Sequence, residues 1–533
     1  MLPEYADGRG VIAPPTLIEQ ETVPIEPFTE RKFAAAYVDR GTRYEPLGIT
    51  LHRHIEGWLC YRDLRGVADE LGIELQQETW DEIHKSMMGS RKKDINTFIA
   101  RLSTRWLRLI FIKGLLQGIE AEKIYGVIFN KGLDKAEKEG LGTLELMMSQ
   151  MALVLEGNIL EIPNVDAEQE KLPPWLKLLP EEEKVLKEFD FLVQAGINKV
   201  IRDRVVDPAD REFYRIVWQK TQRLQAALVA RDLPKTEEEL QFYPTEFRGK
   251  APTIGLYAET FKKTVQARLD RFVWAGEKTG DSDTRCEVGV VACLRREQLT
   301  EQPLANIDGK LTDKGRELAE VYIDLYRRGI IHAVNMAGVE SREEFRLRNF
   351  DAFFRYMKAA GVPLTVHAGE LTPDNGDLAY DNLHYAIMEL GVAGIGHAVR
   401  LFDDTPRMRW LLFMAIVKGI RIEVNLTSNY WTGVARKLQD HPILKALRGE
   451  HSLFRTQAMR EALMRIIVFC DDDPIIAGAN NKQPLAKEFA TLTRHVGNMG
   501  FKSPREMLYF FKWFGDRLAV WRRKQILGAF VPA

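Results

Sequence analysis

Four of the ten histidines in this 533-residue chain lie at the ends of short apolar runs. His52 and His54 belong to Thr-Leu-His-Arg-His-Ile-Glu-Gly at residues 50–57, and His367 and His397 lie at the ends of two later runs. Residues two apart on a β-strand point to the same side, so His52 and His54 would project together. Two adjacent imidazoles provide half of the ligands that a metal site needs.

Carboxylates follow apolar runs in the same way. Glu370 comes three residues after His367, and Asp472 and Asp473 end the last run. Three imidazoles and a carboxylate suit zinc, although iron, cobalt or manganese would also fit. A catalytic metal keeps one position for water, whose pKa it lowers to about 7. We interpret the other histidines as structural groups, namely His84, His332, His384, His441, His451 and His495.

The elements that must position these groups are apolar runs that alternate with helical patterns. Alternation of this kind implies parallel strands joined by right-handed crossovers. Eight strands predict a (β/α)8 TIM barrel, whose active site lies at the carboxyl ends of the strands. A doubly wound sheet is the structural alternative, but no Gly-rich phosphate loop follows any strand. The predicted strands are 47–54, 143–148, 287–294, 330–338, 363–370, 394–399, 421–429 and 465–472.

Two of the intervening helices are predicted in detail. Residues 351–360 and 405–418 carry apolar side chains at helical spacing, and each segment ends before a glycine. Asp403 and Asp404 are the predicted N-cap of the second helix.

The spacing of the runs also divides the chain into domains. Residues 1–45 are rich in Pro, Glu and Thr and form a predicted arm, whereas 46–149 and 286–500 form the barrel. The segment 150–285 is too long for a normal barrel connection and is predicted to be a helical insertion, with a smaller one between 447 and 463. Residues 501–533 form a predicted carboxy-terminal helix, for which packing on the barrel is favoured over partner binding.

Composition limits the possible partners. A net charge of −1 gives no field that would attract nucleic acid or an anionic membrane. The four cysteines form no CxxC pair, which argues against a disulfide framework and a thiolate zinc site. A secretory signal and a long apolar run are not evident, so we expect a cytoplasmic protein. The insertion 150–285 is expected to support a homo-oligomer or to cover the barrel mouth.

Six short motifs occur in register along the chain. They are His-x-His-x-x-Gly (52–57), Met-Ala-Gly-Val-Glu (336–340), His-Ala-Gly-Glu (367–370), Gly-His (396–397), Leu-Thr-Ser-Asn (426–429) and Asp-Asp-Pro (472–474). Together they resemble the adenosine deaminase family of the metal-dependent amidohydrolase superfamily. The resemblance covers about 47–105 and 287–500.

The resemblance implies a role for each matching residue. His52, His54, His367 and Asp472 are similar to the ligands of one zinc ion. Four positions resemble the catalytic and purine-binding residues of the family. Glu370 resembles the acid that protonates N1, and His397 resembles the residue that orients and helps to deprotonate the attacking water. Asp473 resembles the group that contacts that water and N7, and Gly338 resembles the residue whose backbone contacts N3.

Two further positions concern substrate recognition. Phe98 and Ile99 lie on an apolar helical pattern that resembles the family's nucleoside lid, and a core-facing helix is an equally good interpretation. Glu56 stands where the family usually has Asp, which accepts a hydrogen bond from the 5′-hydroxyl. An ionised carboxylate attracts a hydroxyl and repels a phosphate.

The resemblance therefore predicts an enzyme that hydrolyses adenosine or 2′-deoxyadenosine to inosine or 2′-deoxyinosine and releases ammonia. Deamination of another adenine-containing compound, such as AMP, ATP, adenine or a modified purine, is the first alternative. A binding or assembly protein on a deaminase-like barrel is the second. It is disfavoured because the chain keeps every predicted metal ligand and also keeps Glu370.

Overall fold

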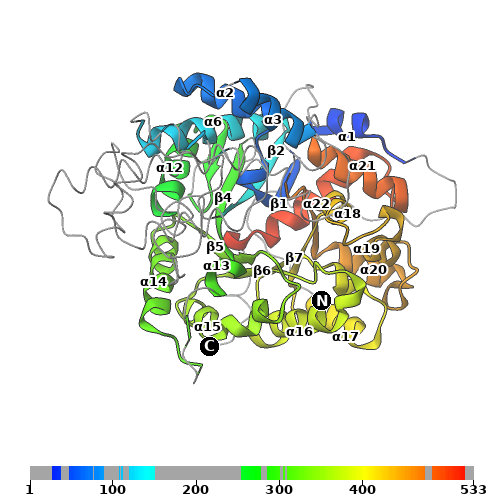
Figure 1. The fold of residues 1–533 in the computed structure, drawn as a ribbon. Coiled ribbons are helices and arrows are strands. Elements are labelled where there is room, and N and C mark those ends of the chain that lie inside the picture. Colours follow the sequence, from blue (N-terminus) through cyan, green and yellow to red (C-terminus); the bar gives the residue numbers. More distant parts are fainter. Residues whose placement is uncertain are drawn as a thin grey trace.

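The structure is a computed structural model of the 533-residue chain. It describes residues 27–37, 47–75, 77–88, 119–149, 254–277, 285–300, 304–305, 309–473 and 483–522, with single positions between 107 and 114. Figure 1 shows the strands at the centre of the molecule with helices around them.

Eight parallel strands form the predicted barrel. They are hydrogen-bonded in the order β1-β2-β4-β5-β6-β7-β8-β9. A parallel bridge between Arg53 and Asp472 brings β1 and β9 together and closes the barrel. The strands are β1 (Gly48–His54), β2 (Leu141–Ser149), β4 (Cys286–Arg295), β5 (Ala333–Ala337), β6 (Leu364–Ala368), β7 (Gly394–His397), β8 (Arg421–Val424) and β9 (Ile467–Phe469). The (β/α)8 fold class is thereby confirmed.

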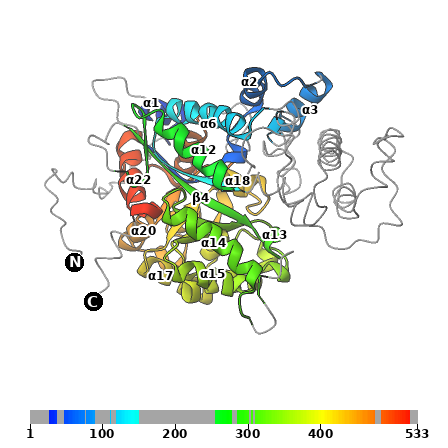
Figure 2. The ribbon, with the colours of Figure 1, turned by 90° about the vertical axis from the view of Figure 1, so that its left-hand side faces the viewer.

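Helices cover the outside of the strands, and Figure 2 shows α6, α12, α14 and α15 along this surface. The described helices are α1 (Glu30–Tyr37), α2 (Tyr61–Leu71), α3 (Gln77–Met88), α6 (Ala121–Lys138), α12 (Ile254–Gln266), α13 (Arg296–Thr300), α14 (Asp313–Arg327), α15 (Asp351–Ala359), α16 (Gly376–His384), α17 (Pro406–Val417), α18 (Leu426–Trp431), α19 (Pro442–Leu447), α20 (Gln457–Met464), α21 (Pro484–Val496) and α22 (Pro504–Leu518). None of these described helices is both long enough and apolar enough to cross a membrane.

The last part of the predicted insertion packs on the barrel wall. Tyr257 of α12 lies 4.6 Å from Tyr125 of α6, measured between ring centroids. The short strand β3 (Phe272–Trp274) pairs with the start of β4. Residues 150–253 lie outside the described residues, so the division into domains and the role of the insertion stay predictions.

Two predicted elements need correction. The strand predicted at 421–429 ends at Val424, and Leu426–Trp431 forms α18. The buried carboxyl group of Glu488 accepts the N–H of Thr427 at 3.1 Å and so satisfies a backbone donor in the first turn of this helix.

The helix predictions at 351–360 and 405–418 are confirmed by α15 and α17, but the predicted cap of α17 is wrong. Thr405, rather than Asp403 or Asp404, accepts the N–H of Met408. Thr405 directly precedes Pro406, the first helical residue, and is therefore in the capping position.

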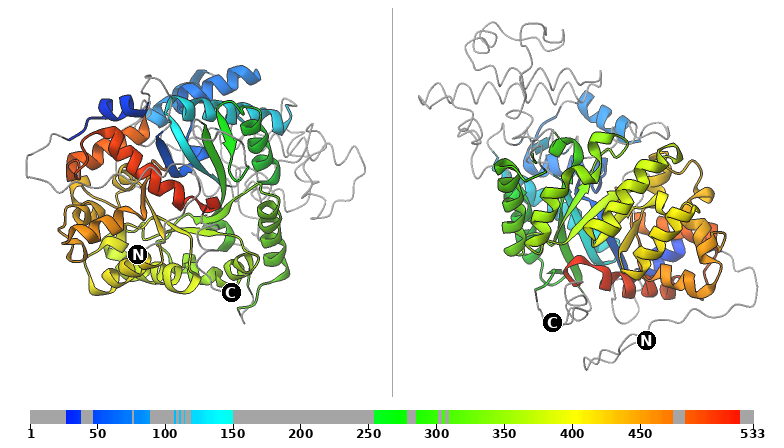
Figure 3. Two further views of the ribbon diagram at one scale, coloured as in Figure 1. Left: turned by 180° about the vertical axis from the view of Figure 1, so that it is seen from behind. Right: turned by 90° about the horizontal axis from the view of Figure 1, so that it is seen from below.

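The carboxy-terminal segment lies against the amino end of the barrel. Figure 3 shows α22, in red, across this end. Beyond α22, Ala519 joins an apolar cluster with Ile49 of β1 and Val468 of β9. Val520 packs with Met147 of β2 and other strand residues in a second cluster. The segment after α22 therefore fills the amino end of the barrel.

Candidate metal centre and active site

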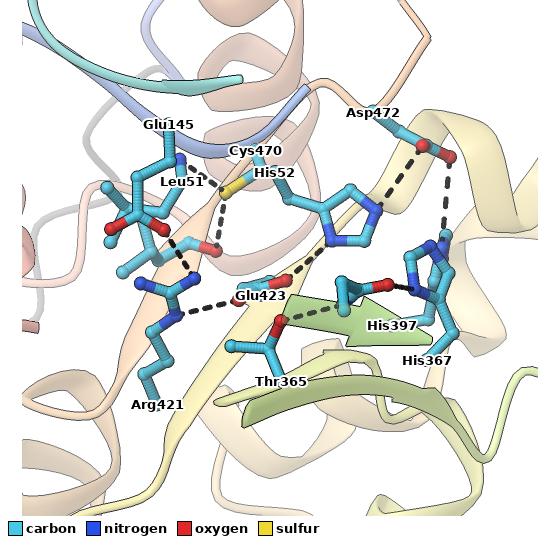
Figure 4. Close-up of polar contacts among 12 residues, drawn as sticks. Leu51, His52, Glu145, Thr365, His367, His397, Arg421, Glu423, Cys470 and Asp472 are labelled. Carbon is cyan, nitrogen blue, oxygen red and sulfur yellow. Dashed lines mark hydrogen bonds and ion pairs between the residues drawn. The ribbon is translucent and has the colours of Figure 1, made fainter. Parts of the chain in front are cut away.

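Five predicted side chains meet at the carboxyl end of the barrel. His54 Nε2 lies 3.3 Å from His367 Nε2 and 3.5 Å from Asp472 Oδ1, and His52 Nε2 lies 3.4 Å from the same oxygen. His397 Nε2 is 3.9 Å from Asp472 Oδ2. Figure 4 shows Asp472 between His52 and His397.

These spacings fit a metal ion. Four ligands arranged tetrahedrally at about 2.1 Å from one ion lie about 3.4 Å from one another. The ligand atoms of His52, His54 and His367 all lie within 4.8 Å of each other, and so do those of His52, His397 and Asp472. Imidazole nitrogens and one carboxylate are also the donors that zinc prefers. Both geometry and chemistry therefore fit the predicted ligand set.

The electrostatics of the cluster favour metal binding. Burial lowers the pKa of His54 to about 4 and holds the pKa of His367 well below its usual value, so both imidazoles are neutral. Burial alone would raise the pKa of Asp472. The hydrogen bond to His52 and the electrostatic effect of the nearby histidines outweigh burial and lower this pKa overall. Burial also lowers the pKa of His52, whereas hydrogen bonds to Asp472 and Glu423 outweigh it and raise that pKa to about 10. A cation would therefore displace a proton from this cluster.

Two buried side chains hold the ligand imidazoles in place. His52 Nδ1 lies 2.6 Å from Glu423 Oε2, and His367 Nδ1 lies 2.9 Å from Asn335 Oδ1. Acceptors at Nδ1 fix the tautomer and leave Nε2 of each ring for a metal. The sequence analysis missed both residues. A charged residue inside the buried strand Arg421–Val424 was the available signal for Glu423.

His397 is oriented by Asn429, which also contacts a second histidine. Asn429 Nδ2 lies 2.8 Å from His397 Nδ1, and Asn429 Oδ1 is 3.2 Å from His441 Nε2. Burial lowers the pKa of His397 to about 3, so its ring is neutral. His441, interpreted from the sequence as a structural group, is thus linked to the predicted catalytic histidine.

Glu370 lies beside His397 and is suited to carry a proton. Its Oε1 is 3.5 Å from His397 Nδ1, and its side chain is 20% exposed. Burial, followed by the charge of Asp472, raises the pKa of Glu370 to about 8. Glu340 accepts the backbone N–H groups of Gly369 and Glu370 at 2.9 and 3.0 Å, and so holds this turn. Glu370 is therefore largely protonated at neutral pH.

The backbone at the cluster is strained. His397 has a φ of 62° and Asp472 a φ of 54°. Residues other than glycine rarely adopt such positive values. Such outliers concentrate at functional sites, where surrounding contacts hold them in place.

Two glycines make room for the site. A Cβ at Gly396 would lie 2.6 Å from His52 Cε1, and one at Gly57 would lie 1.6 Å from Asp473 Oδ1. Gly57 and Gly396 each belong to a motif noted in the sequence, and the close approach of a functional side chain explains why glycine is needed there.

The remaining predicted residues are placed in part. Asp473 is buried, and Gly338 lies exposed just after β5 with its carbonyl 3.3 Å from Arg296 Nη1. Glu56 is in the short helix Ile55–Gly57 that follows β1, and its side chain lies outside the described residues. Phe98 and Ile99 also lie outside them.

Comparison with known proteins identifies relatives of this chain. Residues 303–453 match the model of the adenosine deaminase family. The adenosine deaminase of Erwinia tasmaniensis is 37% identical over 119 residues, which cover 22% of this chain and 32% of that protein. The adenosine deaminase of Vibrio parahaemolyticus is 28% identical over 211 residues, or 39% and 52% of the two chains. These matches confirm the resemblance to the adenosine deaminase family.

The matched parts are shorter than the relatives themselves. The chain spans 32% of the length of the Erwinia tasmaniensis protein and 52% of the length of the Vibrio parahaemolyticus protein. An adenine deaminase structure from Arthrobacter aurescens overlays with a TM-score of 0.47 and 14% identity, covering 91% of this chain and 100% of that one.

Proposed function

We propose that this protein is a metal-dependent deaminase that hydrolyses the exocyclic amine of adenosine or 2′-deoxyadenosine. The products are inosine or 2′-deoxyinosine and ammonia. The observation that carries the proposal is the ligand cluster, with spacings of 3.3 to 3.5 Å, beside a carboxyl group with a pKa of about 8. The cluster would supply a nucleophile, and the carboxyl group an acid, on the same side of the barrel mouth.

His52, His54, His367 and Asp472 would hold the metal, for which zinc is our choice because of the nitrogen and oxygen donors. When bound, the metal lowers the pKa of water and so allows water to attack near neutral pH.

The chain's own groups move the protons. Protonated Glu370 donates to N1 of the purine. This makes C6 more electrophilic and allows N1 to accept the electron pair of the C6–N1 double bond when water attacks. With the Asn429 amide turned so that its oxygen accepts the Nδ1–H of His397, Nε2 of the neutral ring would accept the proton of the attacking water. Asp473 lies next to Asp472 and would hold the water and N7 in place. The proton held by His397 then passes to the amine, which leaves as ammonia. The hydroxyl proton on C6 is lost as the carbonyl forms, and it restores the proton of Glu370.

The nucleoside is our proposed substrate because of Glu56. Its carboxylate, one methylene longer than the family's usual Asp, would accept the 5′-hydroxyl and repel a phosphate. Gly338, exposed after β5, would contact N3 through its backbone.

A substrate panel tests the proposal. We would measure kcat/KM for adenosine, 2′-deoxyadenosine, AMP, ATP and adenine, following the absorbance change from adenine-type to hypoxanthine-type rings and the release of ammonia. The proposal predicts the fastest turnover for one of the two nucleosides. Faster turnover of AMP or ATP would refute the assignment of the nucleoside, and no turnover of any compound by the metal-loaded protein would refute the deaminase assignment.

A further inference from the structure

A row of buried charged side chains runs from the metal cluster through the barrel interior (Figure 4). It begins at His52, whose Nδ1 is 2.6 Å from Glu423, and continues to Arg421, whose Nε is 2.7 Å from the other oxygen of Glu423. Arg421 Nη2 then pairs with Glu145 Oε2 at 2.5 Å. All four side chains are 0% exposed.

The far end of this row is attached to the carboxy-terminal segment. The N–H of Val520 donates to Glu145 Oε1 at 2.7 Å, and Arg421 Nη1 donates to the carbonyl of Leu518 at 3.1 Å. Trp521 fixes the same segment, because its Nε1 donates to Glu287 Oε1 at 2.9 Å. Residues 518–522, defined here as the terminal plug, therefore touch the charged row at two points.

Each member of the row depends on its neighbours. Water does not reach these groups, so a lost partner would leave a buried charge uncompensated. Arg421 is the branching point, since its planar guanidinium bonds to Glu423, Glu145 and Leu518 in three directions. The neighbouring strand β7 makes room for it, because a Cβ at Gly394 would lie 2.6 Å from Arg421 Nε.

We propose that the terminal plug is a positioning element for the metal site. Its two backbone hydrogen bonds hold Glu145 and Arg421, Arg421 holds Glu423, and Glu423 sets the tautomer and ring angle of His52. Glu145 and Arg421 are thus positioning residues that act through His52. The inference rests on the proposed metal site and adds to it a dependence on residues at the opposite end of the barrel.

A purely structural role makes a different prediction. If the row and the plug only stabilise the fold, weakening them lowers the melting temperature and leaves the metal site of the folded protein unchanged. If they position His52, metal affinity and ligand geometry change in protein that is still folded. The two roles are therefore separated by measurements on the metal itself.

The sharpest variant removes one hydrogen bond. Val520→Pro deletes the N–H that Glu145 accepts. The preceding residue, Ala519, has φ −55° and ψ 134°, a conformation that a following proline permits. Val520→Ala is the matched control, because it removes more of the buried side chain but keeps the N–H. Arg421→Lys is the second variant, since it keeps the charge and loses the branched bonding.

The full-length proteins would be stripped with a chelator and titrated with Zn²⁺, and the Co²⁺ forms compared by their visible absorption spectra. Loss of a partner that orients a ligand histidine typically weakens metal binding by about 10- to 100-fold. We expect a loss in that range for Arg421→Lys, a loss of about threefold to tenfold for the more distant Val520→Pro, and altered Co²⁺ spectra for both. Val520→Ala should match the wild type in both measurements.

Wild-type affinity and spectra in both Val520→Pro and Arg421→Lys, with only a lower melting temperature, would overturn the inference. If Val520→Pro does not fold, Arg421→Lys decides alone. Failure of the wild type to bind either metal would instead refute the proposed metal site, so the two failures are distinguishable.

Discussion

The two ends of the barrel differ in what fills them. At the carboxyl end, the four predicted site histidines lie together with the acidic side chains of Glu370, Asp472 and Asp473. At the amino end, the apolar side chains of Ile49, Val468 and Ala519 fill the space. Both ends are built by the same strands, because β1 carries Ile49 at one end and His54 at the other.

The backbone differs in the same direction. His397 and Asp472 have positive φ at the carboxyl end. Among the described residues, the strand residues at the amino end all have negative φ. Polar burial and strain cost stability, and they persist where function requires them. Substitutions at the carboxyl end should therefore change metal binding and chemistry. At the amino end, substitutions of apolar side chains outside the charged row should change stability.

The largest effect is expected for His367→Ala. It removes a ligand nitrogen that lies 3.3 Å from His54 Nε2, so tight metal binding and deamination should both be lost. Metal content by mass spectrometry and activity toward adenosine check this. His495→Ala, in the last turn of α21, is the control and should keep both. Full metal content in the His367→Ala protein would contradict the ligand assignment.

Glu370→Gln should separate chemistry from metal binding. The amide cannot donate the proton that the buried carboxyl group carries, so activity should fall by about 10²-fold or more while metal content stays normal. Activity close to that of the wild type would rule out Glu370 as the acid.

The pH profile offers an independent check on Glu370. Its pKa is raised to about 8, so the acid form is present below that value and is lost as the pH rises through it. A bound cation would favour the carboxylate, so kcat/KM of the wild type should fall on the alkaline side with an apparent pKa of 8 or lower. A rate that keeps rising to pH 10 would argue against a protonated Glu370.

Gly396→Ala should disturb the metal site by steric pressure alone. Its Cβ would meet the His52 ring at 2.6 Å, and the displaced ring should bind metal about 10- to 100-fold more weakly. Gly126→Ala in α6 is the matched control, because a Cβ there meets nothing within 4 Å, and its metal affinity should not change. Equal affinities for the two variants would show that the ring adjusts without consequence.

At the amino end, Ile49→Ala should have the smallest effect on chemistry. The buried side chain packs with Val468 and Ala519, so its loss should lower the free energy of unfolding by about 2–5 kcal/mol. Metal affinity of the folded protein and kcat/KM at a temperature well below unfolding should stay within twofold of the wild type. A tenfold loss of metal affinity would remove the contrast between the two ends.

Much of this arrangement could be predicted from the sequence. All eight barrel strands were predicted, because buried parallel strands give continuous apolar runs that are easy to find. His52, His54, His367, His397 and Asp472 were predicted to converge because the carboxyl ends of such strands meet at one mouth.

Other features depend on pairing across long distances. Glu423 and Asn335 bond to ligand histidines 371 and 32 positions away, and neither stands in a motif that indicates such a partner. The terminal plug bonds to Glu145 across 375 positions. The strand predicted through Asn429 failed because a buried glutamate, Glu488, stabilises the start of a helix there. Such contacts are fixed by tertiary packing. A charged residue within an apolar strand, such as Glu423, indicates that a buried partner exists but not which residue it is.

Reconstitution with metal tests the central claim most directly. Full-length protein stripped of metal would be titrated with Zn²⁺ while adenosine deamination and ammonia release are followed. We predict no activity in the stripped protein and a linear return of activity that ends at about one equivalent of zinc per chain, as a site with four protein ligands requires. Deamination that persists without metal, or a fully zinc-loaded protein that leaves adenosine unchanged, would contradict the account.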